Sequence, residues 1–216
     1  MFNLNFNLYS ISIRIISVII AFSLHEAAHA WTAYMLGDPT ARQMGRLTLN
    51  PLAHVDPAGL FCLIFFGFGW GRPVPINPRY YKDPKGGMVW TAFAGPLMNF
   101  ILSFVCIFIY YLLFKISISF CYSVVGSYIL DVLAATAYIS AGLGIFNCIP
   151  IPPLDGSKVL FAFLPDDNYF KSIEGSPLLS ILFMAILFSG IISSPITQLE
   201  TSMIQIFSNI VMGILF

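Results

Sequence analysis

Residues 15–31 read I-I-S-V-I-I-A-F-S-L-H-E-A-A-H-A-W, an isoleucine-rich run followed directly by two histidines and a glutamate. The apolar part resembles a membrane helix, which needs about 20 mainly apolar residues to cross a bilayer. A charged side chain at membrane depth costs about 2.5–3.5 kcal/mol on insertion scales. His25, Glu26 and His29 therefore indicate a functional site within a first membrane helix, which we expect over residues 8–36.

The whole chain has the composition of a membrane protein. Of its 216 residues, 58% are hydrophobic and 9% are charged, whereas soluble domains carry about 25% charged residues. The formal net charge of zero gives no indication of a nucleic-acid partner. We expect an all-α polytopic membrane protein with about five membrane helices. The later helices are expected at 88–114, 132–154 and 175–199. The short tail 201–216 is expected to complete a fifth span with a few residues before it, or to lie in the interface.

A proline-rich stretch, residues 37–87, separates the first two expected helices and carries six of the ten basic residues. Within it, the apolar residues 59–70 are too few to cross the bilayer as a helix, so we expect a segment that enters the membrane and returns. Residues 71–80 have the proline content of an edge strand or extended loop. If 37–87 and 157–176 are cytoplasmic, eight of the ten basic residues lie inside, as the positive-inside rule requires.

The histidines and the glutamate have the spacing of a zinc site. Residues four apart on a helix share a face, so His25 and His29 point the same way, as two ligands of one metal require. H-E-x-x-H on a helix is typical of zinc hydrolases in which the glutamate is the general base. Catalytic zinc keeps three protein ligands and one open position, so the motif predicts a third ligand elsewhere.

Asp155, in N-C-I-P-I-P-P-L-D-G (147–156), is the strongest candidate for the third ligand. The prolines of this stretch end the preceding helix, because proline has no N–H donor. The charge pattern brings this end of the chain to the same side as the histidines. The other acids are weaker candidates, with Asp131 expected on the opposite side and a solvated loop expected for Asp166, Asp167 and Glu174.

Three motifs in this order resemble the site-2 protease family (peptidase family M50) of intramembrane zinc metalloproteases. They are H-E-A-A-H, A-G-P-L-M-N (94–99) and N-C-I-P-I-P-P-L-D-G, and the resemblance covers roughly residues 15–160. The stretch G-R-L-T-L-N-P-L-A-H-V-D-P-A-G (45–59) is similar to the small bacterial and archaeal members. The resemblance implies one Zn²⁺ held by His25, His29 and Asp155, with Glu26 activating a water in an active site that faces the cytoplasm.

The implied reaction is hydrolysis of a peptide bond within or near a transmembrane segment. The substrate is then a single-span membrane protein or a signal-peptide remnant in the lipid bilayer, and an unwound substrate could pair with residues 71–80 as an added strand. Asn99 and Asn147 are candidate donors to the oxyanion, although interhelical hydrogen bonds would explain both equally well. His54 is a candidate for lining the site, with a purely structural loop histidine as the alternative.

The expected organisation is a single membrane-embedded domain, 1–216, with a catalytic core over about 8–160 and accessory helices over about 175–216. We expect no PDZ domain, because the connection at 116–130 is too short, and no CBS domain. The expected location is a bacterial cell (inner) membrane. A zinc-binding membrane transporter or sensor without hydrolysis is the alternative, but such a site does not require a general base beside its first ligand.

Overall fold

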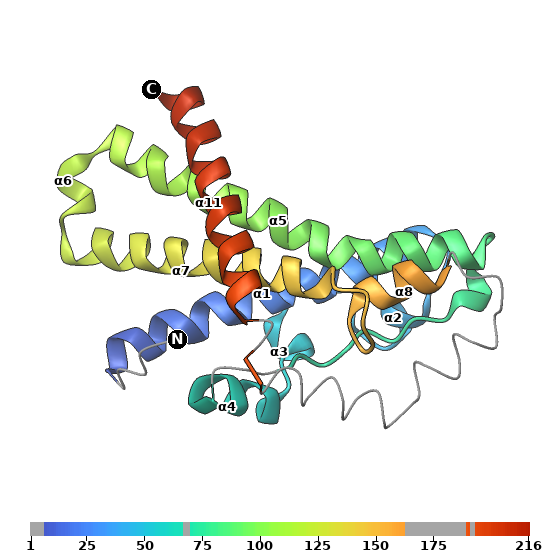
Figure 1. Cartoon of the computed structure of the whole chain (residues 1–216). Helices are drawn as coiled ribbons and strands as arrows, with labels where there is room; N and C mark the ends of the chain where they lie inside the picture. The colour runs from blue at the N-terminus through green and yellow to red at the C-terminus, as the bar shows by residue number, and fades with distance from the viewer. Residues whose placement is uncertain (1–6, 67–69, 163–188, 191–192) are drawn as a thin grey trace.

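The computed structural model describes residues 7–66, 70–162, 189–190 and 193–216, which are mainly helical. Three helices in this part of the chain are long and apolar enough to cross a membrane: α1 (Leu8–Met35), α5 (Pro84–Ile116) and α7 (Val124–Asn147). They lie side by side and alternate in direction, with the short helix α6 (Ile118–Cys121) joining α5 to α7 (Figure 1). The boundaries predicted for the first membrane helix agree with α1 to within one residue.

The predicted C-terminal region needs correction. Its expected helix at 175–199 falls largely outside the described residues, and residues 193–199 belong to α11 (Ser193–Leu215). One helix of 23 residues thus includes both these residues and most of the tail. Its extent agrees with the predicted segment made of the tail and a few residues before it, whereas the end predicted at 199 for the preceding helix is too late. The all-α class is confirmed, and the described residues contain three helices that meet the length and apolarity of a span, where about five were expected over the whole chain.

Small and weakly polar residues fill the contacts between α1, α5 and α7. Lipid is as apolar as leucine, so membrane helices associate through close backbone packing and hydrogen bonds, which small residues allow. Large apolar side chains such as Trp90 and Ile101 are instead exposed on the outer surface of α5. The buried positions include Ser17, Ala21, Ala30, Thr91, Gly95, Ser103, Ala137, Ser140 and Ala141.

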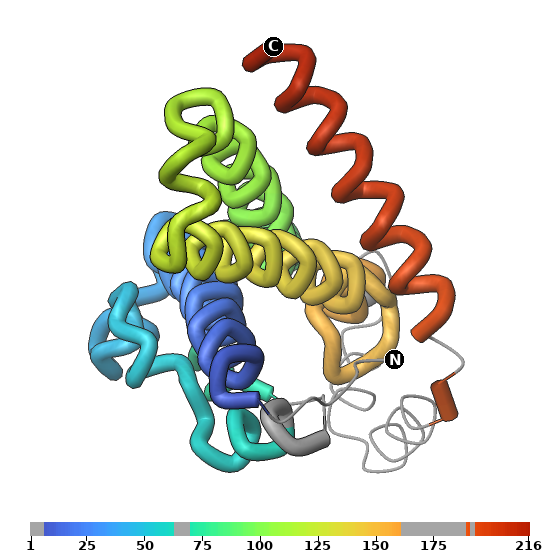
Figure 2. The backbone as a smooth tube through the Cα atoms, turned by 90° about the vertical axis from the view of Figure 1, so that its left-hand side faces the viewer, coloured from blue at the N-terminus to red at the C-terminus, as the bar shows by residue number. Residues whose placement is uncertain are grey.

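The helix α11 covers part of α5 and α7 and is inclined across them (Figure 1). Ile204 and Val211 of α11 are buried in one apolar cluster with residues of α5 and α7, namely Cys106, Ile107, Ala137 and Ala141. Figure 2 shows α1 and α11 apart from one another, with α7 between them. This arrangement leaves a space between α1, α7 and α11 that is described with the site below.

The stretch between α1 and α5 contains short helices and an extended run. The helix α4 (Pro57–Phe66) covers most of the predicted re-entrant segment, and an antiparallel bridge between Val55 and Gly71 shows that the chain returns beside its point of entry. Residues 72–77 belong to no helix; Asn77 has an extended backbone, and the prolines at 73, 75 and 78 favour an extended backbone in the residue before each of them. Pro78–Tyr80 form the 3-10 helix η1, so the run predicted over 71–80 ends at residue 77. The remaining short helices are α2 (Thr40–Gln43), α3 (Pro51–His54) and, after α7, α8 (Asp155–Ala162).

Candidate metal centre

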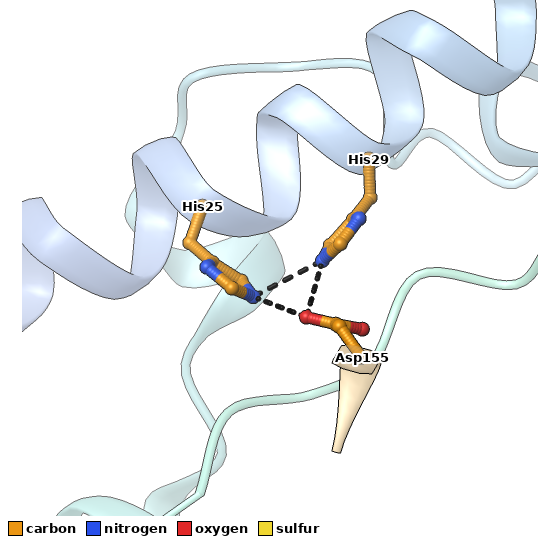
Figure 3. A group of neighbouring side chains, drawn as sticks. All are labelled: His25, His29 and Asp155. Atoms are coloured by element: carbon orange, nitrogen blue, oxygen red, sulfur yellow. Dashed lines mark hydrogen bonds and ion pairs between the residues drawn. The ribbon is translucent and has the colours of Figure 1, made fainter. Parts of the chain in front are cut away.

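The structure brings together His25, His29 and Asp155, although Asp155 is 130 positions from His25 in the sequence. The α1 helix directs both imidazole rings to one side, and Asp155 faces them from the first position of α8 (Figure 3). Asp155 Oδ2 lies 3.1 Å from His25 Nε2 and 3.2 Å from His29 Nε2, and the two Nε2 atoms are 3.0 Å apart. All three residues are buried, so the cluster is largely shielded from solvent.

The chemistry of these atoms fits a metal. His29 Nδ1 lies 2.6 Å from the carbonyl oxygen of Thr91, which can only accept, so Nδ1 carries the hydrogen of the neutral ring. His29 Nε2 then carries no hydrogen and has a lone pair. This lone pair repels the facing carboxylate oxygen of Asp155 unless a cation or a proton lies between them. Ligand atoms about 2.0–2.1 Å from a tetrahedral zinc ion are about 3.3 Å from one another. The observed spacing is therefore close to that of a zinc site.

Asp155 owes its position to the chain that precedes α8. The α7 helix ends at Asn147, and residues 148–154 form a proline-containing loop that turns back before Asp155. Burial alone would raise the pKa of Asp155, but the positive charge that the facing rings of His29 and His25 carry when they are protonated holds this pKa below its usual range. Lys158, one turn further along α8, lies 3.7 Å from Asp155 Oδ1. A bound cation would favour the ionised carboxylate for the same electrostatic reason, and a carboxylate must be ionised to bind a metal.

Glu26 is anchored to the extended run that follows the re-entrant segment. Glu26 Oε2 accepts a hydrogen bond from the backbone N–H of Val74 at 3.0 Å, and Val74 is itself buried. Glu26 also lines the same cavity as His25, His29 and Asp155. Its carboxylate therefore has one oxygen fixed by the protein and lies beside the candidate metal centre.

Arg46 holds this extended run in place. Its Nη2 donates to the carbonyl oxygens of Arg72 and Pro73, while the N–H of Arg72 donates to the carbonyl oxygen of His54 at 2.8 Å. Burial lowers the pKa of the Arg46 guanidinium, and the nearby carboxylate of Glu26 opposes that shift. Arg46 thus supports the Val74 amide on which the orientation of Glu26 depends.

The three remaining candidate residues occupy different surroundings. Asn99 is fully buried behind His25, with its amide 3.0 Å from His25 Nδ1, and does not line the cavity. Asn147 lines the cavity and donates to the carbonyl oxygen of Leu143 in its own helix at 3.0 Å. His54 is fully buried outside the cavity, where its Nε2 lies 2.7 Å from the carbonyl oxygen of Thr48.

The competing acids are separated from the cluster wherever the structure describes them. Asp131 accepts a hydrogen bond from the hydroxyl of Tyr9 at 2.6 Å, at the opposite end of α1 from the histidines. The predicted position of Asp131 is therefore confirmed. The other three acids, Asp166, Asp167 and Glu174, lie outside the described residues.

Thr91 and Gly95 contact the histidines from α5 and were not among the predicted site residues. Thr91 acts through its backbone carbonyl, so its side chain gave no signal. Gly95 is where α5 comes closest to the rings: a Cβ added there would lie 2.4 Å from His29 Nε2 and 2.6 Å from His25 Cε1. Positions 91, 95 and 99 are four residues apart, which places them on one face of a helix. This spacing is the signal that could have identified the face of α5 that contacts the histidines.

We expect Gly95→Ala to weaken zinc binding by roughly 10–100-fold, the range reported for damage to the surroundings of a metal ligand. The added methyl group would displace the ring atoms that face Asp155. Zinc affinity measured by competition with a chelator tests this expectation. Gly142→Ala is a matched control, because a Cβ there meets Glu200 only at the ordinary contact distance of 3.6 Å. Equal zinc affinity in Gly95→Ala and wild type would contradict the close approach of Gly95 to the two histidine rings.

A cavity of about 1020 Å³ adjoins the candidate metal centre. Its wall along α1 runs from Ser10 to His29, and α7 and α11 supply much of the rest. This stretch of helix, at 1.5 Å per residue, is about 28 Å long, which approaches the roughly 30 Å thickness of the bilayer core. The metal centre is thus open to a space as long as a membrane-spanning segment.

Comparisons with known proteins identify the family of this chain. The sequence profile of peptidase family M50 matches residues 13–190. "Putative zinc metalloprotease YwhC" of Bacillus subtilis (strain 168) is 33% identical over 211 residues, 91% of each chain. Two other putative zinc metalloproteases also match. MJ0611 of Methanocaldococcus jannaschii is 33% identical over 180 residues, 82% of each chain. Rip2 of Mycobacterium tuberculosis strain H37Rv is 26% identical over 176 residues, 79% of this chain and 64% of that protein. No solved structure gave a match. The chain belongs to peptidase family M50, the family of the site-2 proteases.

Proposed function

We propose that this membrane protein is an intramembrane zinc metalloprotease that hydrolyses peptide bonds within or near transmembrane segments. The observation that carries the proposal is the convergence of His25, His29 and Asp155 beside Glu26 in one cavity of a membrane-helix bundle. The names of the related proteins from Bacillus, Methanocaldococcus and Mycobacterium, all zinc metalloproteases, support the same activity.

The residues of the chain have complementary roles in this reaction. His25, His29 and Asp155 would hold one zinc ion, which would supply a Lewis acid for the scissile carbonyl and for the attacking water. Glu26, which lines the same cavity, is the group that would take a proton from the attacking water as general base and return it to the leaving amine as general acid. Because Oε2 of Glu26 already accepts the hydrogen bond from Val74, Oε1 has more of its capacity left and is the favoured acceptor of the proton.

The proposed substrate is a single-span membrane protein or a signal-peptide remnant. A transmembrane helix hides its carbonyl groups in its own hydrogen bonds, so the substrate must unwind locally before cleavage. The cavity along α1 has the length to receive such a segment from the bilayer. Asn147 lines this cavity near Asp155 and is the better placed of the two asparagines to contact a substrate.

The extended residues 71–77 are the proposed guide for the unwound substrate, which would lie along them as an added strand. They carry Val74, whose amide contacts Glu26, so they link the substrate strand directly to the general base. The proline residues of this run prevent it from forming a regular sheet of its own.

We expect Arg46→Gln to lower kcat/KM for cleavage by about tenfold or more while zinc content stays at the wild-type level. The shorter neutral side chain loses the two hydrogen bonds to the extended run, a contribution of about 1.5–3 kcal/mol for each bond to a charged group. Arg42→Gln, which changes an exposed arginine of α2, is the matched control. If Arg46→Gln cleaves at the wild-type rate and at the same peptide bonds, residues 71–77 do not guide the substrate.

We propose that the active site faces the cytoplasm from a bacterial inner membrane. The basic residues Arg42 of α2 and Lys158 of α8 belong to elements at the same end of the bundle, opposite α6 (Figure 1). The positive-inside rule assigns that end to the cytoplasm. Labelling of single cysteines placed in α2 and α6, in intact cells, tests this orientation.

The test of the function is cleavage in reconstituted liposomes. The purified protein is mixed with a panel of single-span membrane proteins whose spanning segments contain glycine, proline or small polar residues, and products are identified by mass spectrometry. We expect internal cleavage that a zinc chelator stops and added zinc restores. Zinc bound by the protein without cleavage of any substrate in the panel would favour the transporter or sensor alternative.

A further inference from the structure

One face of α5 carries the groups that contact the non-ligating nitrogen of each histidine. The carbonyl oxygen of Thr91 lies 2.6 Å from His29 Nδ1, and the side-chain amide of Asn99 lies 3.0 Å from His25 Nδ1. Thr91, Gly95 and Asn99 are four residues apart, so they follow one another along this face. Each histidine therefore has one nitrogen directed at Asp155 and the other directed at α5.

Binding of zinc by His25 would determine which of its ring nitrogens carries the hydrogen. A histidine that binds a metal through Nε2 must have a lone pair there, and its neutral ring then carries the hydrogen on Nδ1. His25 Nε2 is the atom that faces His29 and Asp155, so Nδ1 is the donor nitrogen. Its partner on Asn99 must be an acceptor, which is the carbonyl oxygen of the amide and not its NH₂ group.

A second observation points to the same orientation of the amide. With Nδ2 directed at His25, Oδ1 of the fully buried Asn99 has no hydrogen-bond partner within the described residues. The oxygen and nitrogen of an amide occupy nearly the same volume, and their hydrogen bonds decide which is which. A half-turn of the amide gives Oδ1 the N–H of His25 as its donor. It thereby pairs the buried oxygen, an acceptor that costs about 1–3 kcal/mol when left unpaired, and it moves the NH₂ group to the position that Oδ1 held.

We propose that Asn99 is a positioning residue that fixes the ring of His25 by accepting a hydrogen bond from Nδ1–H through Oδ1. The inference rests on the zinc site of the proposed function. Asn99 holds His25 as the Thr91 carbonyl holds His29, and Gly95 between them leaves room for both rings. Such partners orient the ring, raise the basicity of the ligating nitrogen and fix the tautomer. Asn99 would affect zinc binding through His25, and it would not contact the substrate.

Two substitutions at position 99 distinguish this role from simple packing. Aspartate has nearly the shape of asparagine and can only accept when ionised, so Asn99→Asp keeps the hydrogen bond from His25. Leucine has a similar volume and can neither donate nor accept. We expect the zinc affinity of Asn99→Asp to stay within a few-fold of wild type or to increase, and that of Asn99→Leu to fall by about 10–100-fold. Zinc affinity is measured by chelator competition on folded, detergent-purified protein.

The control is Ser103→Ala, which changes a fully buried polar residue one turn further along α5. Thermal unfolding of the metal-free proteins reports any purely structural damage. Equal zinc affinity in wild type, Asn99→Asp and Asn99→Leu would overturn the proposal, as would equally weak binding by both variants, because that result requires the NH₂ group. Failure of wild type itself to bind zinc would instead refute the proposed zinc site.

Discussion

Asp155→Ala should abolish stable zinc binding by the purified protein. Wild type is expected to retain about one zinc ion per chain, as a catalytic site with three protein ligands does. The variant keeps His25 and His29 but loses the oxygen that lies 3.1–3.2 Å from both of their Nε2 atoms. The loss of a direct ligand should exceed the roughly 10–100-fold decrease in affinity that follows loss of an outer partner.

The measurement is the metal content of protein purified in detergent and dialysed against increasing concentrations of a zinc chelator. Asp83→Ala is the matched control, because Asp83 is exposed and its side chain makes no capping hydrogen bond at the start of α5. Full retention of zinc by Asp155→Ala would mean that the third ligand is another residue. Absence of zinc from wild type after purification with added zinc would show that a proton, and not a metal, occupies the cluster.

Much of the membrane core was predictable because its signals are local. Composition and a mainly apolar run are enough to identify a spanning helix, and α1 begins and ends within one residue of the expected limits. The limits expected at 132–154 were wrong, because α7 spans Val124–Asn147 and the proline-containing stretch that follows lies outside the helix. The prediction of Asp155 used charge asymmetry to place two distant segments on one side of the membrane, and the structure brings these segments into contact. The C-terminal helix was harder to delimit, because residues on both sides of position 200 are uncharged and similar in composition.

The parts of the site that could not be predicted depend on backbone atoms and on packing. The Thr91 carbonyl and the Val74 amide orient His29 and Glu26, yet any residue type has such groups. Asn99 was noticed as a polar residue in an apolar helix, but its partner depends on how α5 packs against α1. The residue type therefore identified Asn99 as important, and only the tertiary structure indicates which atom it contacts.

Glu26→Gln should stop cleavage while leaving the metal centre intact. Glutamine has the shape of glutamate and its Oε1 can still accept the hydrogen bond from Val74, but it cannot take a proton from water. A general base typically contributes 10²–10⁴-fold, so we expect kcat to fall by about this factor. Zinc content should match that of wild type, because Glu26 is not among the three residues that form the cluster.

Two further variants separate the loss of the base from the loss of charge. Glu26→Asp keeps a carboxylate on a shorter side chain and should retain more activity than Glu26→Gln, whereas Asp83→Asn removes an exposed charge and should have no effect. Cleavage of the single-span substrates in liposomes, followed from the first turnover, gives the rates. A Glu26→Gln protein that cleaves as fast as wild type would exclude Glu26 as the base. If Glu26→Gln also leaves the cellular phenotype intact and wild type cleaves no substrate, zinc transport or sensing becomes the better explanation of the site.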